Sequence, residues 1–249
     1  MTSIIRIVSR LWIKIKRQVR KTMADNGISR QTTVATVLNG MRYDILMGKY
    51  NEKCRISEVE LSNKYQVSRS SVRTALQMLE RDGLVHIQPN GRKMVTPVDQ
   101  KYINDLCQTR SILECEAVRL ILEQDVMDLS ELIRIAGLFH KALQEQDDKE
   151  RGKLLSEINT QFHDQLFILA DNKALIQCWN SLSPVCTALL EINSTLPLSM
   201  NEHEFYTSHL KIVTMLETRD ENIIEFIRYH AYEASMKDAL VAIEKSKEI

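Results

Sequence analysis

The stretch SEVELSNKYQVSRSSVRTALQMLERD, residues 57–82, decides the fold of the N-terminal part of the chain. Ser57 and Glu60 form a capping box, in which each side chain bonds an otherwise free amide at the start of a helix. After a turn at residues 66–67, Ser68 is placed to cap a second helix whose apolar positions follow helical spacing. Two short helices around a tight turn are typical of a helix-turn-helix.

The second helix carries basic and hydroxyl side chains where it begins. Arg69 and Arg73 lie four residues apart on one face, beside the hydroxyls of Ser68 and Ser70. Guanidinium groups bond guanine edges or phosphates, and hydroxyls with free amides at a helix start suit phosphate oxygens. The alternative is an ordinary amphipathic hairpin whose arginines are only solvated, and this pattern alone favours DNA binding modestly.

Residues 84–96 read as a β-hairpin that directly follows this helix. LVHIQ and RKMVT have the character of strands, and the Pro-Asn-Gly sequence between them is a turn signal. A hairpin with a basic rim after a recognition helix makes a winged helix-turn-helix. We predict that this domain spans residues 31–98, with its first helix over residues 34–50.

Residues 67–98, VSRSSVRTALQMLERDGLVHIQPNGRKMVTPV, resemble the DNA-binding domain of the GntR family of bacterial transcription regulators. The family pattern V-S-R-x-x-V-R-x-A-L-x-x-L-x-x-x-G-L matches residues 67–84 at every fixed position. One departure is YNEK at residues 50–53, where the family usually has Pro-Gly. The resemblance implies that DNA is contacted by Ser68, Arg69, Ser70 and Arg73, with Asn90 and Gly91 at the tip of the wing.

Charge is divided unevenly along the 249 residues, although the formal net charge is zero. Residues 1–98 carry 18 Lys and Arg against 7 Asp and Glu, whereas residues 99–249 carry 15 against 26. A basic first part suggests a polyanion partner for that part alone. The five cysteines show no C-x-x-C spacing, which is typical of reduced core thiols and predicts a cytoplasmic protein.

The N-terminal extension, residues 1–30, has two interpretations. Its first 22 residues combine apolar positions at helical spacing with seven Lys and Arg. They could form a basic amphipathic helix that touches lipid or phosphates, or an upstream extension outside the functional protein, with Met23 as the real start. The second interpretation is favoured, and the charges predict no stable insertion into a membrane.

Residues 99–249 show no strand signal and divide into about six helical segments separated by capping residues. An antiparallel helical bundle is the simplest architecture for such a chain. We therefore predict a mainly α protein, in which an N-terminal winged helix-turn-helix with a small β-hairpin precedes a C-terminal antiparallel all-α bundle that binds an effector and dimerises.

Three of the bundle segments carry a histidine on or beside the apolar stripe, namely His163, His209 and His230. Asn159 lies one turn before His163 and shares its face. Because a buried polar group without a partner costs ~1–3 kcal/mol, these side chains need a reason to be there. Either each histidine is hydrogen-bonded separately in the core, or together they bind a divalent metal beside the oxygen of Asn159. The three together slightly favour a metal.

The spacing of these histidines resembles the metal signature of the FCD effector domain, which follows the winged helix in the FadR-type branch of the GntR family. Asn159 stands where that family usually has aspartate, and NTQFHDQLFILADN, residues 159–172, is similar to the segment around it. The resemblance implies a divalent metal of the Zn, Ni or Mn class. Since a neutral amide adds no charge, metal affinity is expected to be reduced or lost.

Arg110 in LCQTRSILECEAVRL, residues 106–120, matches the arginine of the family's R-x-x-L-E motif. The resemblance implies that it meets the carboxylate of a small organic or sugar acid in a bidentate pair. An ion pair with Glu114, one turn along the helix, is about as plausible from the spacing.

The leading hypothesis is a ligand-responsive DNA-binding regulator, a repressor, that binds a near-palindromic double-stranded operator as a homodimer. The alternatives are a metal-dependent enzyme or an acid-binding module that uses the site formed by His163, His209 and His230. The enzyme is disfavoured because Asp164 and Glu157 point largely away from His163, which leaves no convincing general base.

Overall fold

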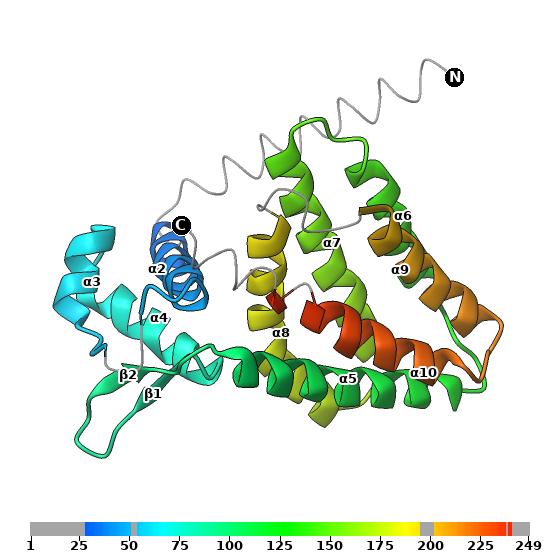
Figure 1. Ribbon diagram of the computed structural model, residues 1–249, viewed down its shortest axis with the longest axis horizontal. Helices are drawn as coiled ribbons and strands as arrows, with labels where there is room; N and C mark the ends of the chain where they lie inside the picture. Colours follow the sequence, from blue (N-terminus) through cyan, green and yellow to red (C-terminus); the bar gives the residue numbers. More distant parts are fainter. Residues whose placement is uncertain (1–27, 51–53, 195–201, 238, 241–249) are drawn as a thin grey trace. The chain divides into compact units, whose positions relative to one another are not determined.

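The computed structural model describes residues 28–50, 54–194, 202–237 and 239–240 (Figure 1). Most of the predicted N-terminal extension, residues 1–27, lies outside the described residues, and so do residues 51–53 of the departure from the family pattern. The contacts within the chain divide it into two compact units. One comprises the described residues up to Gly40 with Ser57–Met78, and the other comprises the described residues of Met41–Ile56 with those from Leu79 onward.

The predicted helix-turn-helix is present as α3, Glu58–Tyr65, and α4, Arg69–Arg81, and it is preceded by α2, Ile28–Leu46. Ser57 caps α3, since its Oγ accepts from the amide of Glu60 at 3.3 Å. The turn passes through Gln66, which adopts a left-handed φ of 54°. The Oγ of Ser68 then accepts from the amide of Ser71 at 3.2 Å, so Ser68 starts α4 as predicted.

A close approach between α2 and α3 depends on Gly40. A Cβ at this position would lie 2.6 Å from the hydroxyl of Tyr65 and 3.0 Å or less from two of its ring atoms. Any larger residue at position 40 would therefore push Tyr65 away. The buried face of α4 comprises Val72, Ala75, Leu76 and Leu79, which are the apolar positions expected from the sequence.

The hairpin after α4 consists of β1, Val85–Ile87, and β2, Lys93–Val95, which pair antiparallel with Val85 opposite Val95. Gly91 closes the turn with a φ of 76°, a conformation that glycine adopts readily. Its amide donates to the carbonyl of Gln88 at 2.8 Å. The segment before α3 also joins the hairpin, because Arg55 forms a bridge with Met94. The predicted wing is thus confirmed, with strands one residue shorter at each end.

A buried ion pair fixes the end of α2 to the residue that follows α4. Arg42 donates to Oδ2 of Asp82 through Nε at 2.9 Å and through a terminal nitrogen at 2.7 Å. The side chain of Asp82 is fully buried, and its Oδ1 has no hydrogen-bond partner among the described residues. The Asp82 carboxylate therefore depends on Arg42 for its charge compensation.

We expect Arg42→Met to lower the free energy of unfolding by ~3–5 kcal/mol, because it leaves a buried carboxylate uncompensated. The double variant Arg42→Met/Asp82→Leu removes both charges and should recover most of that loss. Urea denaturation of the three proteins measures both effects. Equal stabilities of the single and double variants would contradict this account of the pair.

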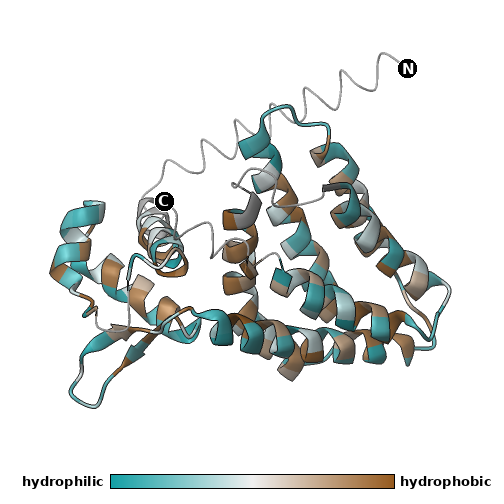
Figure 2. Cartoon of the chain, viewed as in Figure 1, coloured by the Kyte–Doolittle hydropathy of each residue, from teal (hydrophilic) through white to brown (hydrophobic). Residues whose placement is uncertain are grey.

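The remaining helices form an all-α bundle, as predicted (Figures 1 and 2). In chain order they are α5 Gln100–Leu122, α6 Ser130–Ala142, α7 Asp148–Leu169, α8 Lys173–Ser194, α9 Glu202–Glu217 and α10 Ile223–Arg228, continued by the π-helical segment η1, Tyr229–Ala234. Asp99 and Asp147 cap α5 and α7, each accepting from the amide three residues on at 2.8 Å.

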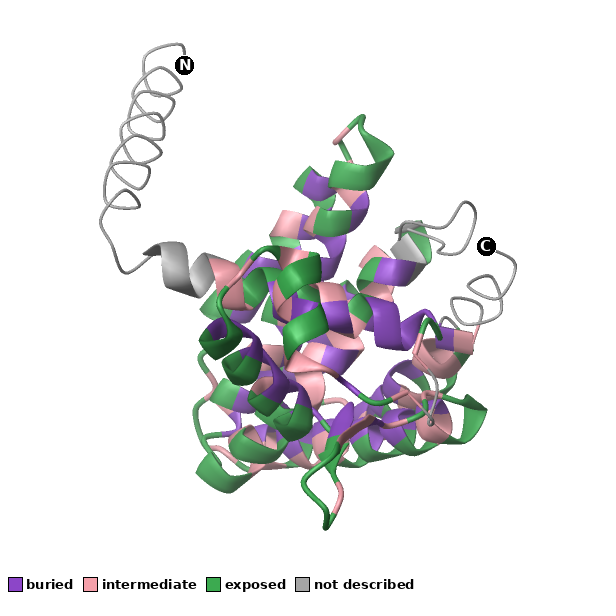
Figure 3. Cartoon of the chain, turned by 90° about the vertical axis from the view of Figure 1, so that its left-hand side faces the viewer, coloured by how far each residue is buried: buried purple, intermediate pink, exposed green. Residues whose placement is uncertain are grey.

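In the bundle, α7 packs against α6 and α8, while α5 packs against α7, α8, α10 and η1. Helix α9 packs against α6 and α10. The core contains Leu132, Phe139, Leu155, Phe162 and Phe167, all nearly or fully buried, and exposed residues cover the outer faces of the helices (Figure 3). In the described part of the chain, no helix is long and apolar enough to cross a membrane.

Candidate DNA-recognition face and buried histidine centre

The start of α4 presents the predicted DNA-contacting side chains. Arg69, Ser70 and Arg73 are exposed, and the hydroxyl of Ser68 lies 2.8 Å from that of Ser70. Arg73 donates to Oε2 of Glu58 at 3.1 Å, so one guanidinium is held by the first residue of α3. The result is a helix start that offers free amides, hydroxyls and two guanidinium groups to an anionic surface.

Glu58 was missed by reasoning from the sequence. It lies 15 residues from Arg73, and only the folded turn brings the two side chains together. Asn90 and Gly91 are exposed at the tip of the hairpin, as predicted. The side-chain oxygen of Asn90 accepts from the amide of Arg92 at 3.0 Å, so Asn90 also stabilises the hairpin turn.

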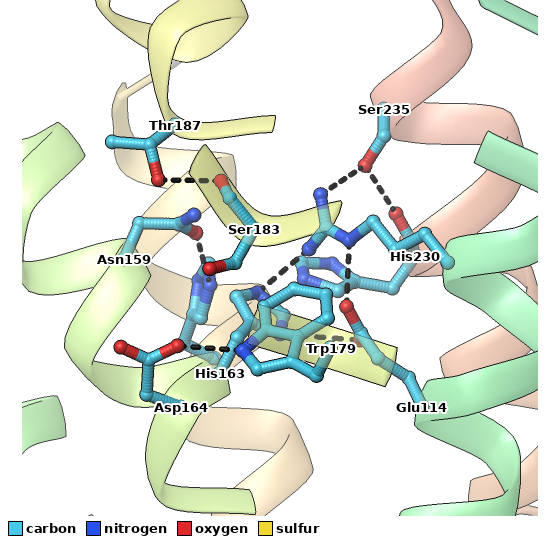
Figure 4. A network of polar contacts seen from close by, with 11 residues as sticks. Glu114, Asn159, His163, Asp164, Trp179, Ser183, Thr187, His230 and Ser235 are labelled. Atoms are coloured by element: carbon cyan, nitrogen blue, oxygen red, sulfur yellow. Dashed lines mark hydrogen bonds and ion pairs between the residues drawn. The ribbon is translucent and has the colours of Figure 1, made fainter. Parts of the chain in front are cut away.

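The three predicted histidines converge in the bundle from α7, α9 and η1. Figure 4 shows His163 and His230 within this cluster of polar side chains. His163, His209 and His230 are 1%, 0% and 8% exposed. One ring nitrogen from each histidine can serve as a metal ligand, and these three nitrogens lie within 4.8 Å of one another. The ring of His163 stacks on that of His230 with centroids 5.4 Å apart, whereas the His209 ring is perpendicular to the His230 ring at 4.9 Å. The predicted convergence is therefore realised.

Hydrogen bonding fixes the tautomer of His209. A carbonyl oxygen can only accept, so Nδ1 of His209, 2.6 Å from the carbonyl oxygen of Phe205, carries the proton. Burial, together with the neighbouring His230 and His163, holds the pKa of His209 well below its usual value, so the ring is neutral. Its Nε2 then presents a lone pair to Oδ1 of Asn159 at 2.9 Å.

That contact brings two acceptors face to face, because the Asn159 oxygen and the His209 Nε2 both carry lone pairs. A cation bound by both atoms would relieve the repulsion, and so would a rotated amide that turns its NH2 group toward the ring. Three imidazole nitrogens and an amide oxygen form a donor set that suits Zn²⁺ or Ni²⁺. The residues present therefore fit a divalent ion.

His163 is held by two charged groups. A terminal nitrogen of Arg110 lies 2.9 Å from Nε2 of His163, and because arginine only donates, Nε2 carries the lone pair and Nδ1 the proton. Nδ1 lies 3.1 Å from Oε2 of Glu114, which is ion-pair distance. The alignment is poor, however, so neither atom has a hydrogen bond among the described residues. Burial lowers the pKa of His163, and Glu114 offsets part of that effect.

Arg110 and Glu114 form a buried ion pair beside the histidines. The Nε of Arg110 donates to Oε1 of Glu114 at 2.6 Å, and NH1 donates to Oγ of Ser235 at 3.0 Å. Burial alone would raise the pKa of Glu114, but Arg110 and then His163 outweigh it and hold that pKa well below its ordinary value. The pairing that the sequence offered as an alternative for Arg110 is therefore present.

The π-helical segment η1 carries His230 and ends beside Ser235, whose Oγ donates to the carbonyl of His230 at 3.2 Å. Single-turn π segments inside α-helices are frequent at functional sites. The sequence predicted a regular helix here and gave no signal of this change. Ser235 lies 125 residues from Arg110, so its part in the centre could not be foreseen either.

Asp164 follows His163 in the chain, but its carboxylate bonds a tryptophan of α8 instead of a histidine. Its Oδ1 accepts from the indole nitrogen of Trp179 at 2.6 Å, and Trp179 stacks on Phe167 with ring centroids 4.5 Å apart. The carboxylate is thus directed at Trp179 of α8 (Figure 4). This agrees with the expectation that Asp164 does not serve His163 as a general base.

Comparison with known proteins identifies both parts of the chain. The family described as bacterial regulatory proteins, gntR family, matches residues 33–95, and the FCD domain family matches residues 105–230. The gluconate operon transcriptional repressor of Bacillus licheniformis is 21% identical over 204 residues, which cover 80% of this chain and 82% of that protein. The Nta operon transcriptional regulator of Aminobacter aminovorans is 30% identical over 129 residues, 52% of this chain and 60% of that protein.

Solved structures share the fold. E. coli McbR/YncC superposes with a TM-score of 0.55 at 18% identity and covers 86% of this chain and 98% of its own. A GntR transcriptional regulator from Rhodococcus sp. RHA1 gives a TM-score of 0.55 at 20% identity, with 83% and 97% covered. The protein therefore belongs to the GntR family of bacterial transcription regulators, with an FCD domain after its winged helix, and is a DNA-binding regulator rather than an enzyme.

Proposed function

We propose that this protein is a homodimeric repressor whose FCD bundle senses a small organic or sugar acid with the help of a divalent metal. The observation that carries the proposal is the buried guanidinium of Arg110 next to three converging histidine nitrogens. Two relatives, from Bacillus licheniformis and Bacillus subtilis, are gluconate operon transcriptional repressors, which supports both a repressor and an acid as effector.

The charge of the centre favours an anionic ligand. Arg110 and Glu114 cancel, and the buried histidines are neutral because their pKa values are lowered by burial. A divalent ion held by these histidines and Asn159 would therefore add two uncompensated positive charges to a buried site. Such charges are costly without an anion, because burial removes the water that would otherwise stabilise them. A carboxylate neutralises one of these two charges and so lowers that cost.

The metal would be held by His163, His209, His230 and Asn159. When bound, an ion of the Zn, Ni or Mn class supplies positive charge and open positions for effector oxygens. Arg110 can orient a carboxylate through paired N–H groups, and the hydrophobic surroundings exclude water. An effector with different affinities for two arrangements of the dimer would change operator affinity by that difference.

DNA binding is assigned to the start of α4 and the hairpin tip. A two-fold symmetric dimer places two copies of α4 in successive major grooves, which predicts a near-palindromic operator. Phosphate contacts by Arg69 and Arg73 make binding depend on salt, with a slope of about −0.9 per phosphate neutralised.

We expect wild-type protein purified in excess acetate, a simple carboxylate, to contain about one divalent ion per chain, as a site with three histidines predicts. The double variant His163→Ala/His209→Ala should contain none, and His140→Ala, at an exposed position on α6, should match wild type. Elemental mass spectrometry after purification without chelators measures all three. A wild type that stays metal-free even after incubation with Zn²⁺, Ni²⁺ and Mn²⁺ in excess acetate would refute the metal part of the proposal.

A further inference from the structure

We infer that Arg110 locks the metal site of this protein, so that a divalent ion binds well only when a carboxylate draws Arg110 away from His163. The inference rests on the proposed function and concerns how its two ligands depend on each other. It starts from one contact, the 2.9 Å between a terminal nitrogen of Arg110 and Nε2 of His163.

An imidazole nitrogen has a single lone pair. Nε2 of His163 uses it to accept the hydrogen bond from Arg110, so the same atom cannot coordinate a metal at the same time. The other ring nitrogen offers no substitute, because Nδ1 carries the proton and lies 3.1 Å from Oε2 of Glu114. Metal coordination by His163 and its contact with Arg110 are therefore mutually exclusive.

The guanidinium is well held in the locked position. Glu114 accepts from Nε at 2.6 Å and Ser235 accepts from NH1 at 3.0 Å, so its three nitrogens have three different partners. Arg110 is only 9% exposed, and desolvation makes its charge costly to move without a compensating anion. A metal ion alone repels the guanidinium but gives it no new partner.

A carboxylate gives the guanidinium that partner. Paired N–H···O bonds to an incoming carboxylate replace the bond to His163, and the released lone pair of Nε2 becomes available to the metal. Repulsion between the two cations also falls once the anion lies between them. Metal and carboxylate therefore bind with positive coupling, and by linkage each raises the affinity of the other by the same factor.

Two variants separate the lock from general damage to the fold. Arg110→Met/Glu114→Gln removes the lock and the carboxylate that it would leave uncompensated, and Ser235→Ala removes one of the three partners of the guanidinium. Co²⁺ is the probe, since its visible absorption reports coordination directly. Full-length, metal-stripped protein is titrated with Co²⁺ in excess acetate or in the same concentration of chloride.

In chloride, we expect the double variant to bind Co²⁺ ~5–150-fold more tightly than wild type, the range usual for coupled sites, and Ser235→Ala to lie between them. Acetate should tighten Co²⁺ binding to wild type and leave the double variant unchanged. Equal affinities of wild type and double variant in chloride would overturn the lock while leaving the metal site intact. If neither protein binds Co²⁺ in either salt, the metal site itself is refuted, and the lock with it.

Discussion

Replacing Arg69 or Arg73 by alanine is expected to weaken operator binding by ~5–150-fold and to leave the fold intact, because a good bidentate base contact contributes ~1–3 kcal/mol. Both side chains are exposed on the first turns of α4, so neither supports the buried core. Arg73 is also oriented by Glu58, which reduces the rotamer entropy that it loses on binding. Fluorescence anisotropy of a labelled operator measures the loss.

Salt dependence separates the two kinds of contact that an arginine can make. A lost phosphate contact weakens binding to all sequences and lowers the salt slope by about 1, whereas a lost guanine contact relaxes selectivity at one position. Arg134→Ala is the matched control, since Arg134 is an exposed arginine on α6 that pairs with Glu131. Full operator binding by both Arg69→Ala and Arg73→Ala would refute the assignment of the recognition face.

Local signals predicted the winged helix well, for a physical reason. The cap at Ser57, the turn at Gln66 and the cap at Ser68 each depend on atoms within a few residues of one another, so the sequence specifies them directly. The hairpin turn at Gly91 is local in the same sense. A nearby carboxylate does not always cap a helix, however: Asp128 accepts from the amide of Ser130, two residues on, but α6 begins at Ser130 with Leu129 at its N-cap position.

The bundle centre was only partly predictable. Helical periodicity shows which face a residue occupies, and this was sufficient to place Asn159, His163, His209 and His230 toward one interior. Helical periodicity does not show which ring nitrogen of a histidine carries the proton, or which group bonds to the other nitrogen, because those partners come from other helices. Arg110 illustrates the limit, since Glu114 was foreseeable one turn away but His163 and Ser235 were not.

Acidification is expected to destabilise the metal-free bundle through these same histidines. Burial lowers the pKa of His163, holds that of His209 well below its usual value, and lowers that of His230 to about 3. In the unfolded chain each histidine returns to a pKa of about 6.5, so below that pH it binds a proton that the folded protein does not bind. Stability is therefore fully present above about pH 6.5 and is lost as the pH falls toward the folded pKa values, by up to ~1.4 kcal/mol per pH unit for each histidine.

His230→Gln tests this most cleanly, because the ring of His230 makes no hydrogen bond within the described part of the chain. Unfolding of the variant should take up about one proton fewer than unfolding of wild type. From about pH 6 to about pH 4, the slope of its unfolding free energy against pH should therefore be smaller by ~1.4 kcal/mol per pH unit. Urea denaturation in the presence of a chelator is followed by tryptophan fluorescence. Because Trp12 and Trp179 are the two tryptophans of the chain, a Trp12→Phe background leaves Trp179, buried in the bundle, as the only reporter. His140→Gln, on the exposed face of α6, is the control. If His230→Gln and wild type show the same slope, His230 is protonated in the folded protein, and the neutral donor set on which the metal site depends is wrong.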